Sequence, residues 1–158
     1  MQFRKGCRLW WLVLPVAALD RVSKCIARAC LAPHGVKTAI PGVFSWAYTQ
    51  NRGAAFSILH GRELLLIALS LALIAALLIY LVRNPENPRW ERIGLWMIIG
   101  GGLGNLFDRI AYGSVIDFIR LDFIRFAIFN VADIFVCTGA ALVVLSVLIS
   151  EGRKKSHG

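Results

Sequence analysis

The stretch LLLIALSLALIAALLIYLV, residues 64–82, runs for 19 residues without a charged side chain. A helix needs about 20 such residues to cross roughly 30 Å of hydrocarbon. Three other blocks of similar length are also apolar, so we place membrane spans at about 9–26, 63–82, 93–112 and 129–149. The sequence therefore predicts an all-α membrane protein with four transmembrane helices.

The composition of the whole chain supports this class. Hydrophobic residues make up 58% of the 158 residues, and the mean hydropathy is +0.65. A soluble domain of this length would expose too much apolar surface. The net charge is +9, but the charges lie between the apolar blocks and form no single basic stripe. We therefore expect one domain over residues 1–158, monomeric, with membrane lipids and no nucleic acid as partners.

Clusters of lysine and arginine predict the orientation. They lie before the first span, between the second and third spans, and after the fourth, so four spans place them all on one side. The positive-inside rule makes that side cytoplasmic. Both termini are then in the cytoplasm, and segments 28–62 and 113–128 face outward. The clusters are Arg4, Lys5 and Arg8; Arg83, Arg89 and Arg92; and Arg153, Lys154 and Lys155.

The first outer segment contains a strand-like pattern. Bulky and small side chains alternate from Phe44 to Thr49, and Pro41-Gly42 marks a turn just before them. This pattern predicts a small extramembrane β-sheet on the outer side of the membrane. The alternative is an irregular amphipathic loop.

Several polar residues lie within the predicted spans, where they are costly and usually functional. Asp20 and Lys24 are four residues apart on one helix face, either as a self-neutralising pair or as support for a polar site. Asn105, Asp108 and Arg109 share a face of the third span that cannot face lipid.

Small residues in the third span predict close helix packing. Gly100 and Gly104 form a small-xxx-small pair that lets a neighbouring backbone approach.

Two aspartates are expected at similar depth near the outer interface. Asp117 follows the third span, and Asp133 lies about one turn into the fourth, on the same face as Asn130. In the first outer segment, Asn51 offers an amide beside Gly53, where a small residue allows backbone to approach a ligand.

Two carboxylates held close together cannot both ionise cheaply, so one keeps its proton near neutral pH. Such a pair supplies a general base and a general acid, which is the chemistry of an aspartyl protease and needs no metal and no cofactor. The four cysteines have no metal-ligand spacing, and we assign Cys30 no role. From spacing alone, a proton relay in a small transporter would present the same two aspartates. A membrane assembly factor would explain the glycines but not the converging carboxylates and amides.

Five segments in order resemble the lipoprotein signal peptidases, the bacterial signal peptidase II family of membrane aspartyl proteases. The resemblance covers nearly the whole chain. The segments and the family patterns they resemble are Asp20–Lys24 with D-x-x-[ST]-K, Asn51–Phe56 with N-x-G-A-[AS]-F, the glycine-rich run ending at Arg109 with G-G-x-x-G-N-x-x-D-R, Gly113–Phe118 with G-x-V-x-D-F, and Phe129–Asp133 with F-N-x-A-D.

The resemblance implies a function and a site. It implies an aspartic endopeptidase that cuts diacylglyceryl-modified prolipoproteins just before the lipidated lipobox cysteine, near the outer face of the membrane. It implies that Asp117 and Asp133 are the catalytic pair, with no metal. The implied substrate-binding or supporting residues are Asp20, Lys24, Asn51, Gly53, Gly104, Asn105, Asp108, Arg109 and Asn130, of which Asp108 is the more structural.

The chain departs from the family pattern at two positions. Many members have proline where this chain has Ala127, and serine where it has Ile134. These differences concern the path of the loop before the fourth span and the hydrogen bonds of Asp133.

Overall fold

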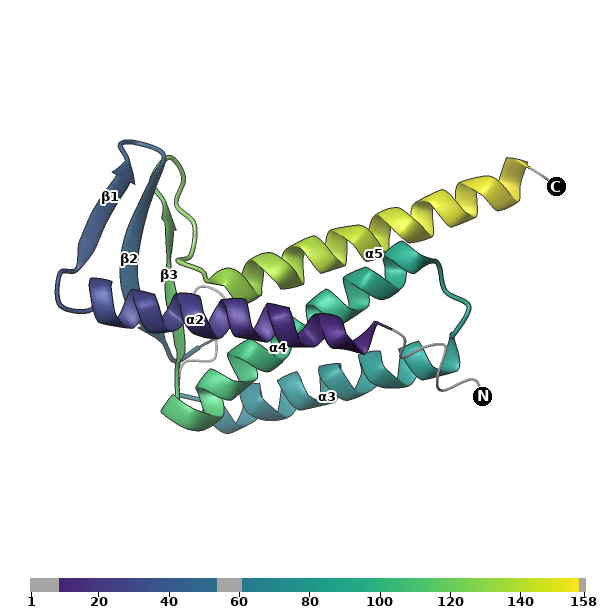
Figure 1. Ribbon diagram of the computed structural model, residues 1–158, viewed down its shortest axis with the longest axis horizontal. Coiled ribbons are helices and arrows are strands. Elements are labelled where there is room, and N and C mark those ends of the chain that lie inside the picture. The colour runs from purple at the N-terminus through teal and green to yellow at the C-terminus, as the bar shows by residue number, and fades with distance from the viewer. Residues whose placement is uncertain (1–8, 54–60, 157–158) are drawn as a thin grey trace.

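The computed structural model describes residues 9–53 and 61–156, which form a helical bundle with a small sheet at one end (Figure 1). A short 3-10 turn, η1 (Trp10–Leu12), leads into the first helix. The elements are then α2 (Val13–Leu31), β1 (Val36–Ile40), β2 (Phe44–Asn51), α3 (Glu63–Arg83), α4 (Arg89–Tyr112), β3 (Val115–Leu121) and α5 (Val131–Ser156).

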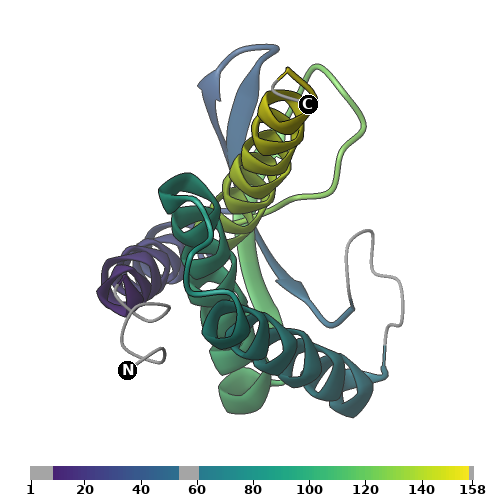
Figure 2. The ribbon, with the colours of Figure 1, turned by 90° about the vertical axis from the view of Figure 1, so that its right-hand side faces the viewer.

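Helix α4 is the centre of the bundle, because α2, α3 and α5 all pack against it. Figure 2 shows α2 and α3 on different sides of α4. Glycines allow the closest approach to α5: a Cβ on Gly94 would lie 2.5 Å from the carbonyl oxygen of Gly139, and a Cβ on Gly101 would lie 2.5 Å from that of Ala132. Gly100 packs against Val16 of α2, so the expected role of that glycine in close packing is confirmed.

The sheet is antiparallel with the strand order β1-β2-β3. It lies beside the end of α2 and the start of α5 (Figure 1). The predicted strand at 44–49 is confirmed within β2. The sequence did not locate β1 or β3, and Asp117 lies on β3, where it is paired in register with Thr49 of β2.

The helix ends differ from the predicted spans: α2 lies at 13–31 instead of 9–26, α4 begins at 89 instead of 93, and α5 lies at 131–156 instead of 129–149. Two of the helices, α3 (Glu63–Arg83) and the Val131–Ser150 part of α5, are long and apolar enough to cross a membrane. Helices α2 and α4 do not meet the same criterion within the described residues, because both carry several charged side chains. The arrangement of four transmembrane helices is therefore a proposal, to which we return below.

Candidate active site

Asp117 and Asp133 are brought together by different elements. Gly113 ends α4 in the left-handed conformation, with φ of 66°, and the chain then turns into β3, which carries Asp117. Asp133 is the third residue of α5. The start of α5 is held against β3 because Phe129 pairs with Ile119.

Asn130 and Asp133 cap the start of α5 reciprocally. The Asn130 side-chain oxygen accepts a hydrogen bond from the Asp133 backbone N–H at 3.0 Å, and Asp133 Oδ2 accepts one from the Asn130 N–H at 3.1 Å. This is the geometry of a capping box, with asparagine and aspartate in the two capping positions. The three-residue spacing in the sequence thus fixes the carboxylate at the start of the helix.

The amide group of Asn130 connects the two aspartates. Its Nδ2 donates to Asp117 Oδ1 at 2.6 Å and to the side-chain oxygen of Asn105 at 3.1 Å. The other oxygen of Asp117 accepts from Asn51 Nδ2 at 3.1 Å, and Asp133 Oδ1 accepts from Asn105 Nδ2 at 2.7 Å. Each carboxylate oxygen of the pair therefore has a protein donor, and Asn130 itself is fully buried.

Lys24 is the centre of a buried ionic cluster beneath this pair. Its Nζ lies 2.8 Å from Asp20 Oδ2, 2.9 Å from Asp108 Oδ2 and 2.9 Å from the side-chain oxygen of Asn105. The ammonium group fixes the orientation of the Asn105 amide, because the oxygen must face Lys24 and the NH₂ group then faces Asp133. Asp20 and Lys24 thus pair with each other, and Lys24 also contacts Asn105, so the two alternatives are compatible with each other.

Asp20 joins three helices. Its Oδ1 accepts from the backbone N–H of Ala132 at 3.0 Å, which ties α2 to the first turn of α5. Gly104 of α4 is required at this contact, since a Cβ there would lie 2.5 Å from Asp20 Oδ2.

Asp108 is completely buried and is held by contacts away from the pair. It accepts from Arg21 at 2.7 Å and from the backbone N–H of Ile116 at 3.3 Å, in addition to Lys24. These contacts fix the start of β3 relative to α4 and α2, which agrees with a structural role.

Arg109 lies on the other side of the pair. Its guanidinium group donates to the carbonyl oxygen of Gly53 at 3.3 Å, and its charge acts on both Asp117 and Asp133. The Gly53 N–H in turn donates to the side-chain oxygen of Asn51 at 2.9 Å. Arg109 therefore holds the turn that orients the Asn51 amide toward Asp117. The rest of this predicted segment, residues 54–56, lies outside the described residues.

A cavity of about 280 Å³ opens on the pair. Its polar wall carries both aspartates together with Asn51, Asn105 and Arg109. Its apolar wall comes from the loop before α5 and from the first turns of that helix: Phe126, Ala127, Ile128, Phe129, Ile134, Val136 and Cys137. Both departures from the family pattern thus line the cavity. Such a mixed wall suits a ligand with an apolar body and one reacting polar group.

Burial makes the carboxyl group of Asp117 a weaker acid than that of an ordinary aspartate. Its side chain is only 2% exposed, and this desolvation, together with the negative charge of Asp133, raises its pKa to about 6. Hydrogen bonds from Asn130 and Asn51 act in the opposite direction, but they are the smaller effects. Asp117 therefore holds a proton at a pH where an exposed aspartate is ionised.

Comparison with known proteins agrees with this geometry. The family described as "Signal peptidase (SPase) II" matches residues 12–149. The chain belongs to the signal peptidase II family. A lipoprotein signal peptidase of Streptococcus thermophilus is 45% identical over 145 residues, covering 92% of this chain and 94% of the relative. One of Streptococcus pneumoniae is 40% identical over 140 residues, covering 89% and 92%.

Solved structures extend this relationship to the fold. Two bacterial membrane enzymes superpose on this signal peptidase II chain with TM-scores of 0.85 and 0.79, at 25% and 26% identity. The first match covers 91% of this chain and 89% of the solved structure. The second covers 87% of this chain and 90% of the solved structure. The chain is therefore an integral membrane peptidase by family.

The signal peptidase II chain brings together every residue that the sequence singled out for the site. One important residue was not among them. Arg21 pairs with Asp108 and lies between Asp20 and Lys24 in the sequence. The sequence could have predicted a buried partner for Arg21, because an arginine inside an otherwise apolar span is costly without one.

Proposed function

We propose that this protein is an aspartic endopeptidase of the bacterial cytoplasmic membrane. It removes the signal peptide from diacylglyceryl-modified prolipoproteins by cutting just before the lipidated cysteine. One observation carries the proposal: the single amide of Asn130 holds Asp117 and reaches the network of Asp133 on the wall of one cavity. The curated relatives named lipoprotein signal peptidase support the choice of substrate.

The two aspartates take different roles at the start of the reaction. Asp133 is the base: it lies in the first turn of α5, where the helix N-terminus favours a negative charge, and it is less buried than Asp117. Asp117 is the acid, because its raised pKa lets it keep the proton. The amide of Asn130 holds Asp117 Oδ1 in place for that donation.

The reaction then needs one water molecule and no covalent enzyme intermediate. Asp133 takes a proton from water while the water oxygen bonds to the scissile carbonyl carbon, and Asp117 gives its proton to the carbonyl oxygen. When the tetrahedral intermediate collapses, the carbon–nitrogen bond breaks, Asp133 passes its proton to the leaving amine, and Asp117 recovers one from the hydroxyl group. The positive charge of Arg109 beside the pair favours the negative charge that develops on the carbonyl oxygen.

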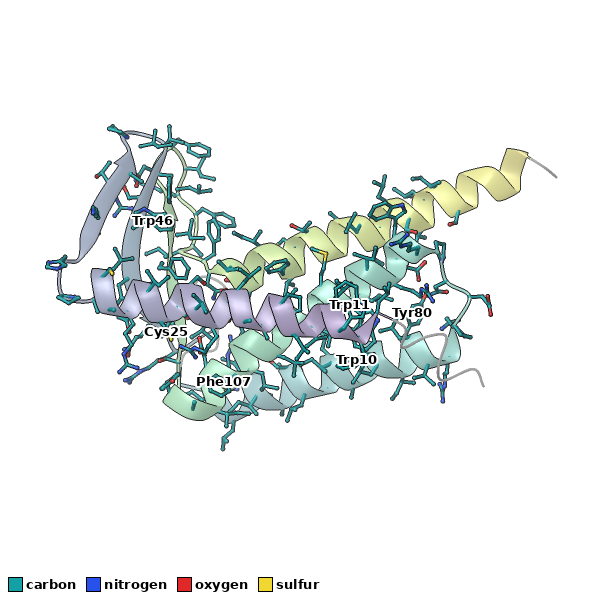
Figure 3. All side chains as sticks on the ribbon, viewed as in Figure 1. Trp10, Trp11, Cys25, Trp46, Tyr80 and Phe107 are labelled. Carbon is teal, nitrogen blue, oxygen red and sulfur yellow. The ribbon has the colours of Figure 1, made fainter. Side chains whose placement is uncertain are left out.

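We place all four long helices across the membrane, with both termini in the cytoplasm and the sheet outside. Exposed aromatic residues at the two ends of the bundle support this placement. Trp10, Trp11 and Tyr80 lie at the end away from the sheet (Figure 3), and Tyr112 lies at the sheet end of α4. Aromatic residues are enriched at both membrane–water interfaces. The catalytic pair then lies near the outer interface, where a lipid-anchored substrate presents its scissile bond.

The deepest charges of α2 and α4 are compatible with this placement because they are buried in the bundle, whereas the exposed Arg28 and Arg89 lie at the helix ends. Asp20, Lys24 and Asp108 are at most 2% exposed and satisfy one another. Charged residues within a membrane protein are tolerated when they face the bundle and pair in this way.

The decisive experiment is cleavage of a purified prolipoprotein in detergent, with and without its diacylglyceryl group. We expect the modified substrate to be cut once, with the lipidated cysteine as the new N-terminal residue and no loss of activity on adding a chelator. Cleavage at another bond, or equal cleavage of the unmodified substrate, would contradict the proposed specificity.

A further inference from the structure

A second cavity lies between α2 and α4, on a part of the surface that the catalytic pair does not use. It measures about 580 Å³ and has no lining residue in common with the catalytic cavity. Most of its lining is apolar and includes Ala17, Leu103, Leu106, Phe107 and Ile110. Phe107 projects from the sheet end of α4 (Figure 3). An apolar groove on a membrane protein is a place where one hydrocarbon chain can lie.

Two arginines are gathered at one end of this groove. The Arg21 guanidinium lies 5.4 Å from the centre of the Phe107 ring and 5.5 Å from that of Tyr112, and the Arg28 guanidinium lies 5.7 Å from the same Tyr112 ring. Two like charges therefore share one aromatic ring. Such contacts stabilise each cation, but they do not remove the repulsion between the two charges.

The carboxylates nearby form no ion pair with Arg28: Asp20, which lines the groove, is paired with Lys24, and Glu63 lies beside Gly113. Asp108 is the ion-pair partner of Arg21, but its other oxygen is already 2.9 Å from Lys24. Arg28 is exposed and has no ion-pair partner among residues 9–53 and 61–156. The exposed guanidinium group of Arg28 therefore has no carboxylate within ion-pair distance among the described residues and can pair with a bound anion.

The depth of these residues matches the shape of a membrane lipid. Arg28 lies in the last turn of α2 and Tyr112 is the last residue of α4, so both lie at the helix ends near the sheet. Ala17 and Leu103 lie two or more helical turns deeper along the same helices. Cations and an aromatic ring at the interface, above an apolar groove, are the arrangement that an anionic headgroup and its acyl chain require.

We propose that the groove between α2 and α4 binds one anionic phospholipid of the outer leaflet. Its phosphate lies against Arg28 and Arg21, and one acyl chain lies along Ala17, Leu103 and Ile110. The site depends on the proposed placement in the membrane, but it does not depend on peptidase activity. It is separate from the position of the substrate, which the catalytic cavity receives.

Native mass spectrometry of the full chain in detergent tests this site with phosphatidylglycerol and phosphatidylcholine of identical acyl chains. We expect one tightly held phosphatidylglycerol and weaker phosphatidylcholine binding. Arg28→Gln should weaken phosphatidylglycerol binding about fivefold, because one arginine near an anionic lipid contributes roughly 1 kcal/mol. Lys37→Gln removes the same charge from the exposed strand β1 and should leave the affinity unchanged.

A second pair of variants tests the acyl-chain part without changing the charge. Ala17→Phe places a ring in the groove and should weaken binding of both lipids, whereas Ala18→Phe changes an exposed neighbour outside the groove and should not. Thermal unfolding without lipid checks that all variants fold. Equal binding of the two lipids, equal effects of Arg28→Gln and Lys37→Gln, or displacement by inorganic phosphate alone would overturn the proposal.

Discussion

Helices α2 and α3 have similar lengths, 19 and 21 residues, but their charges and surfaces differ. From Leu64 to Val82, α3 has no charged residue, and it exposes many large apolar side chains, such as Leu64 at 82% and Leu73 at 56%. Helix α2 carries Asp20 and Lys24, and both are buried. The more apolar helix is thus the one with less of its side-chain surface inside the protein.

This difference shows what an apolar run and a charged residue each indicate about the surface of a helix. An uninterrupted apolar run identifies a surface that faces lipid, and α3 contributes no residue to the catalytic cavity. A charged residue within a span identifies a surface that faces the bundle, because the charge must find partners there. The site is therefore built on α2 and α4, the two long helices that are less apolar, together with strands β2 and β3 and the start of α5.

The largest effect should come from the proposed catalytic pair. Asp117→Asn and Asp133→Asn each remove a proton-transfer group, and either change should reduce cleavage about a thousandfold. The control is Asp122→Asn, which changes a carboxylate bound to Ser45 and Arg120 outside the cavity. Rates on a lipid-modified substrate, with thermal unfolding of each variant, provide the measurement. A folded Asp133→Asn enzyme that still cleaves at a normal rate would mean that the base has been assigned wrongly.

The contrast between the two helices predicts unequal costs of mutation. Lys24→Met leaves Asp20 and Asp108 buried without their common cation, so the free energy of unfolding should fall by roughly 3–5 kcal/mol. Leu73→Ala on α3 removes an exposed side chain and should change it by about 0.5 kcal/mol or less. Chemical unfolding in detergent compares the two. Similar losses would show that the charged cluster does not hold the bundle together.

Two glycines of α4 should differ in the cost of substitution, because one faces the charged helix α2 and the other faces the apolar helix α3. Gly104→Ala would place a methyl group 2.5 Å from Asp20 Oδ2 and should cost about 1–3 kcal/mol of stability. Gly102→Ala faces Ile74 of α3 at 3.6 Å, an ordinary contact, and should be within about 0.5 kcal/mol of wild type. Thermal unfolding of both variants checks this, and the reverse order would refute the proposed contact between α2 and α4.

The smallest effect concerns pH. The pKa of Asp117 is about 6 in the folded protein against 3.8 for an ordinary aspartate, so the folded state prefers the protonated form. Its contribution to stability is present below about pH 3.8 and is lost as the pH rises through about 6. As the acid of the pair, Asp117 should also give cleavage an alkaline limb that begins near pH 6.

Asn51→Leu tests this assignment directly. The variant removes a hydrogen bond that lowers the pKa of Asp117, so the pKa should rise and the alkaline limb should move to higher pH. The lost hydrogen bond should reduce the maximal rate by about tenfold. A full pH profile of kcat/KM for both enzymes is the measurement, and a limb that stays in place would argue against Asp117 as the acid.

Local patterns in the sequence predicted much of this structure. The apolar runs located all four helices, but not their ends: α4 begins before its apolar run and α5 continues past its own, whereas α2 begins later than predicted. The spacing of Asp20 and Lys24 and that of Asn130 and Asp133 correctly placed each pair on one face. The strand-like alternation in β2 was visible for the same reason.

Features that depend on packing between elements could not be read in this way. Strand β3 shows no alternation, because Val115 to Phe118 are all buried, whichever way they point. The pairing of Arg21 with Asp108 joins residues 87 positions apart and depends on how α2 crosses α4. The hydrogen bond from the Ala132 N–H to Asp20 joins residues 112 positions apart. Its donor is a backbone group, which no pattern of side chains predicts.

The proposed catalytic pair is divided between a sheet and a helix, so the distance between its carboxylates depends on how these two elements are placed. Asp117 moves with β3, whereas Asp133 moves with α5, and Asn130 spans the joint between them. A displacement of about 1 Å between reacting groups can cost roughly a hundredfold in rate. A bilayer of different thickness that shifts the sheet relative to the bundle should therefore change the rate of cleavage before it unfolds the protein.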